Sequence, residues 1–218
     1  MQDTHNTEKP IILFDIDNTL LDTKKFVTQV FEQVRQLFEL TQADFVAQKD
    51  AFYQTLAEST DFTPEAFVDF IAESNRSESE LADAEKMVKA VSYFYDDGAL
   101  TNALFEDVVP NLERLSVGHT LGIFSQGDKK YQLKKIENSG LISFFDQRYM
   151  FIEKRKTTPE YMQQLPAHVT IVDDRLDVIA ALQANPFCTP VLLQRQQNES
   201  LEIEEINTTV IHSLSELA

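Results

Sequence analysis

Two patterns of apolar residues divide this chain into a sheet-forming part and a helical block. The first apolar run, residues 11–14, is short and is bounded by Pro10 and Asp15, which is typical of a buried strand. From residue 24 to residue 97, apolar residues instead recur at helical spacing, as in the stripe that begins with Phe26, Val30 and Val34. The pattern therefore predicts a small all-helical block directly after the first strand.

After Gly98, short apolar runs alternate with helical stretches. The apolar runs are residues 120–124, 148–151, 169–172 and 191–193, and the helical stretches lie near 105–116, 128–139, 159–165 and 175–184. Such alternation predicts right-handed crossovers and a parallel sheet with helices on both faces. We therefore expect an α/β fold: a Rossmann-like core from residues 1–22 and 99–218, with an all-helical cap inserted at residues 23–98.

Composition limits the possible partners. The chain has 36 acidic and 19 basic residues, a net charge of -17, which disfavours binding to nucleic acid or to an anionic membrane surface. Its only cysteine, Cys188, cannot form an internal disulfide, and no apolar run approaches the length of a membrane span. The first ten residues lack the pattern of a signal peptide. We expect a cytoplasmic protein, and an acidic tail at residues 199–218 that forms a solvated edge.

Polar side chains gather directly after the predicted strands. Because ligands of such a sheet lie beyond the carboxyl ends of its strands, these residues are expected to meet at one edge. They are Asp15, Asp17 and Thr19 after the first strand, Ser125 after the second, Lys156 near the third, and Asp173, Asp174 and Asp177 after the fourth.

Each of these residue types has a role in phosphoryl transfer. Asp15 can attack phosphorus as a nucleophile, and Asp17 can act as general acid and base. Asp15 and Asp173 offer the oxygen ligands that Mg²⁺ prefers. Three further residues can donate hydrogen bonds to phosphate oxygens, namely Thr19, Ser125 and Lys156. Taken singly, each aspartate could be a helix cap, and Lys156 could be a surface charge. The prediction therefore depends on finding all of these residues together in four loops.

The chain resembles the haloacid dehalogenase superfamily, in its phosphatase-like branch with a helical cap. The segments "DIDNTLLD", "FSQGD", "KTTPEYM" and "VDDRLDVIAALQAN" are similar to the four motifs of that family, in order. The resemblance implies that Asp15 is the nucleophile. It also implies that Asp17 is the acid/base and binds the metal through its backbone carbonyl, and that Thr19, Ser125 and Lys156 bind phosphate.

The fourth motif can be aligned in two ways. One alignment makes Asp173 the metal ligand and Asp177 its partner, and the other gives the metal to Asp174. We prefer Asp173 and place Asp174 second. Gln126 stands where many relatives have Asn, and Asn185 where Gly is common.

These residues predict a Mg²⁺-dependent phosphatase that hydrolyses a small phosphate monoester through an aspartyl-phosphate. A phosphomutase, a haloacid dehalogenase and a non-catalytic phosphate-binding or regulatory protein remain alternatives, although Asp17 disfavours the dehalogenase, which needs no acid for its leaving group. Residues 22–100 contain seven basic and sixteen acidic residues, which favours a small substrate over a polyanion. The aromatic run Tyr93, Phe94 and Tyr95 could stack on that substrate or form core. The lysines at 129, 130, 134 and 135 are expected to form a solvated helix face.

Overall fold

The computed structural model describes residues 9–56, 61–76, 79–195 and 208–218, and within them six strands form one sheet. The strand order is β3-β2-β1-β4-β5-β6, and each neighbouring pair is parallel. The strands are β1 (Ile11–Phe14), β2 (Thr120–Gln126), β3 (Met150–Glu153), β4 (Val169–Asp173), β5 (Cys188–Leu193) and β6 (Thr209–Ile211). The predicted α/β class is confirmed, and β1 lies in the middle of the sheet.

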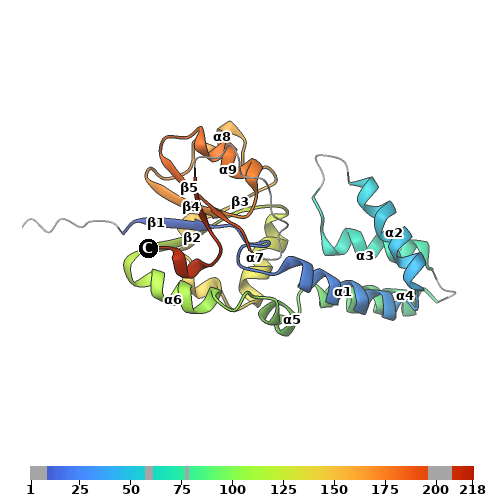
Figure 1. The fold of residues 1–218 in the computed structure, drawn as a ribbon. Helices are drawn as coiled ribbons and strands as arrows, with labels where there is room; N and C mark the ends of the chain where they lie inside the picture. Colours follow the sequence, from blue (N-terminus) through green and yellow to red (C-terminus); the bar gives the residue numbers. More distant parts are fainter. Residues whose placement is uncertain (1–8, 57–60, 77–78, 196–207) are drawn as a thin grey trace, which may run out of the picture.

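Helices cover both faces of the sheet, because alternate residues of the strands point to opposite sides. Leu13 packs with α8 and α9, whereas Ile12 and Phe14 belong to the apolar cluster that includes α6 and α7. Figure 1 shows α8 and α9 on one side of the sheet and α6 on the other. These helices are α6 (Val108–Gly118), α7 (Lys129–Asn138), α8 (Pro159–Met162) and α9 (Leu176–Gln183).

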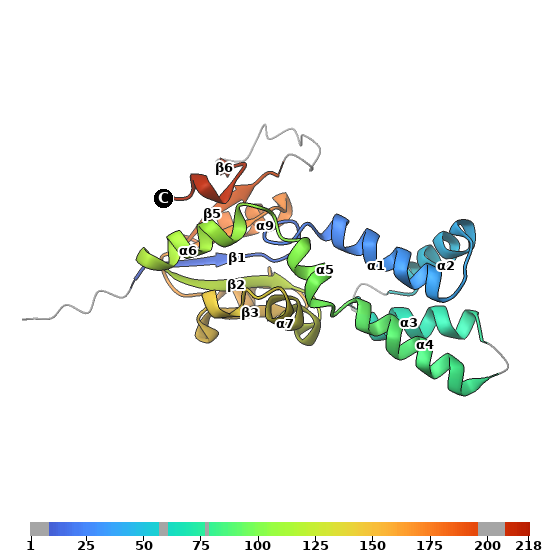
Figure 2. The ribbon, with the colours of Figure 1, turned by 90° about the horizontal axis from the view of Figure 1, so that it is seen from below.

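A helical lobe, formed by the described parts of residues 23–94, extends from the side of the sheet at which β1 ends (Figures 1 and 2). Threonine or acidic side chains cap several of its helices, such as Asp22 at α1 and Thr63 at α3. Phe67 and Phe94 are fully buried among the other aromatic rings of the lobe. The lobe contains α1 (Thr23–Leu37), α2 (Gln42–Thr55), α3 (Pro64–Ser74) and α4 (Glu80–Tyr93), and α5 (Asp97–Asn102) leads back to the sheet.

Gly122 sets the spacing between β2 and its neighbours. A β-carbon at this position would overlap the backbone oxygen of Tyr149 and the side chain of Leu13. Leu13 is the register partner of Gly122 in the adjacent strand. The close approach of these strands therefore requires a residue without a side chain.

The end of the chain differs from the sequence-based expectation. Residues 199–207 lie outside the described residues, but residues 208–218 are packed rather than solvated: they form β6 and a short 3₁₀ helix, and Ile211 and Leu214 are buried. The Asp107 carboxylate accepts hydrogen bonds from the Ser213 hydroxyl and the Leu214 backbone, each at 2.8 Å. The expectation was wrong because β6 pairs with β5 and three apolar side chains of this segment are buried, namely Ile211, Leu214 and Leu217. In the described parts of the chain, every helix is too short or too polar to cross a membrane.

Candidate active site

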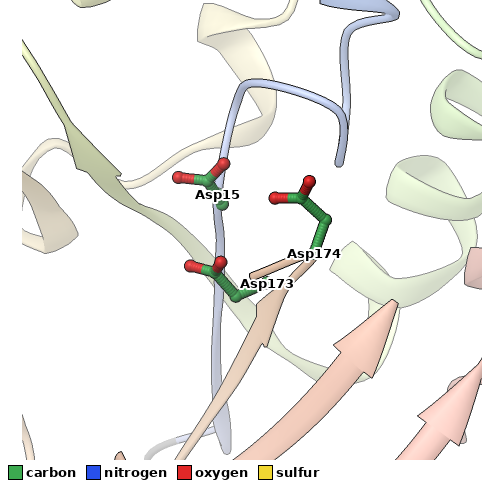
Figure 3. A group of neighbouring side chains, drawn as sticks. All are labelled: Asp15, Asp173 and Asp174. Carbon is green, nitrogen blue, oxygen red and sulfur yellow. The ribbon is translucent and has the colours of Figure 1, made fainter. Parts of the chain in front are cut away.

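Three carboxylates meet where β1 and β4 end. Asp15 follows β1 directly, Asp173 is the last residue of β4, and Asp174 comes next. One oxygen from each lies within 4.8 Å of one oxygen from the other two. Figure 3 shows the three side chains gathered at these strand ends. Because β1 and β4 are adjacent and parallel, their carboxyl ends bring together residues far apart in the sequence.

Lys156 lies buried between two of these carboxylates. Its ammonium donates hydrogen bonds to Asp15 Oδ1 and Asp173 Oδ2, both at 2.5 Å, and its side chain is 1% exposed. Burial opposes its charge, but the two carboxylates outweigh that effect and raise the pKa of Lys156. This placement excludes the surface-charge interpretation of Lys156.

One ammonium does not neutralise three carboxylates. Burial raises the pKa of Asp15 to about 7, against the effect of Lys156 and with a further contribution from Asp173. Burial and then repulsion from Asp15 raise the pKa of Asp174 to about 6. Burial is the main cause of both pKa shifts, and repulsion between the neighbouring carboxylates adds to it. The atoms that these residues offer to a metal are carboxylate oxygens, which suit Mg²⁺. The residues therefore fit the ion that the sequence predicts.

The two aspartates of the fourth motif have different surroundings. Asp173 is fully buried: Lys156 donates to its Oδ2, and the backbone N–H of Arg175 donates to its Oδ1 at 3.0 Å. Asp174, unlike Asp173, lines the cavity in front of the strand ends. Both aspartates are thus placed to bind a metal: Asp173, which we prefer from the sequence, from the buried side, and Asp174 from the cavity side.

Asp17 also lines the cavity, held by a tight turn after β1. The turn depends on Asn18, whose φ of 58° lies in the left-handed region that Asn tolerates. The Asp17 carboxylate accepts hydrogen bonds from Lys135 Nζ at 2.7 and 2.9 Å, from Thr23 Oγ1 at 2.7 Å and from Gln132 Nε2 at 3.0 Å. Burial opposes the charge, but Lys135 and these donors lower the pKa of Asp17.

Sequence reasoning missed Lys135 and Gln132. We expected the lysines of α7 to form a solvated face, and Lys129, Lys130 and Lys134 are indeed exposed, but Lys135 is only 5% exposed. The available signal was the spacing of Gln132 and Lys135, one helical turn apart beside the apolar Ile136. Gly127 makes room for Gln132: its φ is +135°, and a β-carbon there would lie 2.9 Å from Gln132 Nε2.

Thr19 and Ser125 are buried near the site but do not line the cavity. Their side-chain oxygens have no hydrogen-bond partner among the described residues, which is unusual for buried hydroxyls. Asp177 is not brought into the site. Its side chain is 68% exposed and forms an ion pair with Arg175 at 2.6 Å, because the first turn of α9 directs it to solvent. The prediction that Asp177 acts in catalysis is therefore corrected.

The cavity between the strand ends and the helical lobe has a volume of about 310 Å³. The aromatic run of residues 93–95 does not line this cavity, so the structure does not support the idea that the run stacks on the substrate. Other aromatic residues line it instead. The lining residues contributed by the lobe are Thr23, Val27, Phe31, Tyr53, Asp61 and Phe62, and those of α7 are Tyr131, Gln132 and Lys135.

A family model described as haloacid dehalogenase-like hydrolase matches residues 12–188, a span that includes every carboxylate of the site. The chain belongs to this family. Comparison of this haloacid dehalogenase-like hydrolase with curated proteins finds no match.

Solved structures share the fold of this haloacid dehalogenase-like hydrolase. A protein described as a haloacid dehalogenase-like hydrolase from Burkholderia xenovorans is 19% identical, with a TM-score of 0.73, 96% of this chain and 95% of that chain covered. The HAD hydrolase YfnB from Bacillus subtilis, bound to magnesium, is 20% identical, with a TM-score of 0.63 and coverage of 96% and 97%. A 2-haloacid dehalogenase from Pseudomonas syringae is 17% identical, with a TM-score of 0.66 and coverage of 96% and 96%. At these identities the likeness shows the fold alone.

Proposed function

We propose that this hydrolase is a Mg²⁺-dependent phosphatase that acts on a small phosphate monoester through an aspartyl-phosphate on Asp15. The observation that carries the proposal is the pair of carboxylates, Asp15 and Asp17, on one wall of a cavity with Lys156 and Asp174. Two carboxylates allow one to attack phosphorus while the other moves a proton.

Asp15 is the nucleophile. Its carboxylate oxygen forms a bond to phosphorus while the bond from phosphorus to the leaving oxygen breaks. Lys156 holds the Asp15 side chain through Oδ1, which fixes the orientation of the carboxylate. Water then attacks the phosphorus of the aspartyl-phosphate and restores the Asp15 carboxylate.

Asp17 moves the protons of both steps. The pair with Lys135 keeps Asp17 ionised in the free protein, which is the form that accepts a proton from the attacking water. A phosphate dianion beside Asp17 raises the pKa of Asp17, because like charges favour the neutral form. When substrate binds, Asp17 can therefore take up a proton from solvent, and it then gives this proton to the leaving oxygen.

Asp15, Asp174 and Asp173 are the residues that would hold Mg²⁺, together with the backbone carbonyl of Asp17. When bound, the ion would offset the negative charge of the phosphate. The hydroxyls of Thr19 and Ser125 are unpaired but lie behind the cavity lining, so their role as donors to the phosphate oxygens stays a prediction from the sequence.

A haloacid dehalogenase is the competing activity, since one structural neighbour carries that name. A haloacid needs a cation for its own carboxylate. The lining cations Lys135, Lys156 and Arg175 are each paired with aspartates of this chain. Asp17 would moreover repel that carboxylate, whereas in a phosphatase the Mg²⁺ that the aspartates would hold offsets the charge of the phosphate, so the site suits the phosphatase better.

The test compares two substrates under the same conditions. We expect Mg²⁺-dependent release of phosphate from an aryl phosphate and no release of halide from 2-chloropropionate. Asp15→Asn is the matched control and should abolish phosphate release, because an amide is not a nucleophile at phosphorus. Halide release that is lost in Asp15→Asn would overturn the proposal in favour of the dehalogenase.

A further inference from the structure

The helical lobe and α7 line the cavity with aromatic rings. Phe31, Tyr53, Phe62 and Tyr131 all line it. The Tyr53 and Phe62 rings stack with centroids 6.2 Å apart, and Phe62 and Tyr131 lie 6.0 Å apart. Asp15 and Lys156 come from the sheet, so the lobe rings Phe31, Tyr53 and Phe62 are the lining that we expect to receive the leaving group.

One carboxylate lies among these rings. Asp61, next to Phe62, lines the cavity, and its Oδ2 is buried without a hydrogen-bond partner among the described residues. A buried acceptor that lacks a donor costs free energy. Asp61 Oδ2 is therefore an acceptor that a donor on the ligand could satisfy.

The charges of the cavity indicate what kind of donor this is. The lobe contributes no Lys, Arg or His to the described lining, whereas it contributes Asp61. The cations of the lining are Lys135, Lys156 and Arg175, and each forms an ion pair with another aspartate of this chain. Among the described lining residues that the lobe contributes, Asp61 thus carries a negative charge that no cation of the lobe balances.

We propose that the substrate is the phosphate monoester of an amino alcohol, whose ammonium group lies against the aromatic rings and donates to Asp61. The inference depends on the proposed phosphatase activity and names its substrate class. Aromatic faces attract cations, and a carboxylate pairs with an ammonium better than with a hydroxyl. An ester with a second anionic group would place that charge beside Asp61 with no cation to balance it. We therefore expect the enzyme to hydrolyse such an ester poorly.

The wild-type protein is tested first, with alkyl phosphates that differ only at the far end of the leaving group. The series carries an ammonium, a hydroxyl or a carboxylate at that end, at several chain lengths, with an aryl phosphate as the baseline. At the best chain length we expect kcat/KM for the ammonium ester to exceed that of the hydroxyl ester by about 10- to 100-fold, the range for one charge-assisted hydrogen bond. We expect the carboxylate ester to be the poorest.

Variants then assign the preference to Asp61. Asp61→Asn should remove most of the ammonium preference, and Asp61→Lys should shift the preference toward the carboxylate ester. Asp69→Asn is the matched control: Asp69 is an exposed aspartate of the same lobe that does not line the cavity, and its replacement should leave the preference unchanged.

The outcomes separate the two proposals. Failure to hydrolyse the aryl phosphate as well as every alkyl ester overturns the proposed phosphatase. Hydrolysis of the aryl phosphate with equal rates for ammonium and hydroxyl esters, or an ammonium preference that survives in Asp61→Asn, overturns the amino alcohol assignment alone.

Discussion

Replacing the nucleophile should make the metal-free protein more stable at high pH. Asp15 is buried beside Asp173, and its pKa is raised from 3.8 to about 7 even with Lys156 in contact. Its ionised form is therefore less stable in the folded protein than in the unfolded chain. Asp15→Asn removes that ionisation while it preserves the shape of the side chain.

The magnitude follows from the pKa shift. A folded pKa above the unfolded value means that the folded protein binds more protons, so stability falls as the pH rises through this window. From 3.8 to about 7 the shift is roughly three units, each about 1.4 kcal/mol. The cost that Asp15→Asn removes is therefore below about 1 kcal/mol at pH 4 and about 4 kcal/mol at pH 8.

Urea unfolding of both proteins in excess chelator, at several pH values between 4 and 8, measures this effect. Any loss caused by the amide itself does not depend on pH, so the change in the difference between variant and wild type measures the ionisation of Asp15 together with its repulsion of Asp174, which acts in the same direction. We expect the free energy of unfolding of Asp15→Asn, relative to that of wild type, to increase as the pH rises. A difference that stays constant across this range would refute the reasoning.

Three other predictions concern the pair at Asp17, the metal and the sheet. Lys135→Met should lower the free energy of unfolding at pH 7 by about 1–3 kcal/mol, since Asp17 loses its cation. Because the pKa of Asp17 is lowered from 3.8, this loss of stability should disappear as the pH falls below that value. Lys129→Met, which replaces an exposed lysine of the same helix, is the control in urea unfolding. Phosphate release should stop in excess chelator, return with Mg²⁺ and return poorly with Ca²⁺, whose larger and looser coordination misplaces the ligands; equal rates with both ions would contradict the assignment. Gly122→Ala should cost about 1–3 kcal/mol in thermal or urea unfolding, because its β-carbon would overlap the Tyr149 carbonyl; unchanged stability would show that the strands can move apart.

The sheet could be predicted because its strands are short apolar runs between polar turns. Residues 11–14 form β1 with the expected bounds, and the other predicted runs agree with β2 to β5 to within a few residues. β6 was not predicted, because a strand of three residues gives too little periodicity. The helical stripe after residue 24 was read correctly as helix.

The site could be predicted only in part. Asp15, Asp173 and Lys156 lie at or within three residues of the ends of strands, so the parallel topology was enough to bring them together. Lys135 and Gln132 lie inside a helix rich in lysine, and only the packing of α7 shows which of its residues face Asp17. Asp61 lies in a loop of the lobe, and no local pattern places it opposite the strand ends.

The most direct test of the central claim is the mass of the protein after reaction with substrate. Asp17→Asn is mixed with an aryl phosphate and Mg²⁺, quenched within the first turnovers, and analysed by intact-protein and peptide mass spectrometry. An aryl leaving group needs little protonation, so the first step proceeds, while the second step has lost the base that activates water. We predict that one phosphoryl group accumulates on Asp15. Release of phosphate with no covalent adduct on Asp15, in this variant and in wild type, would contradict the account.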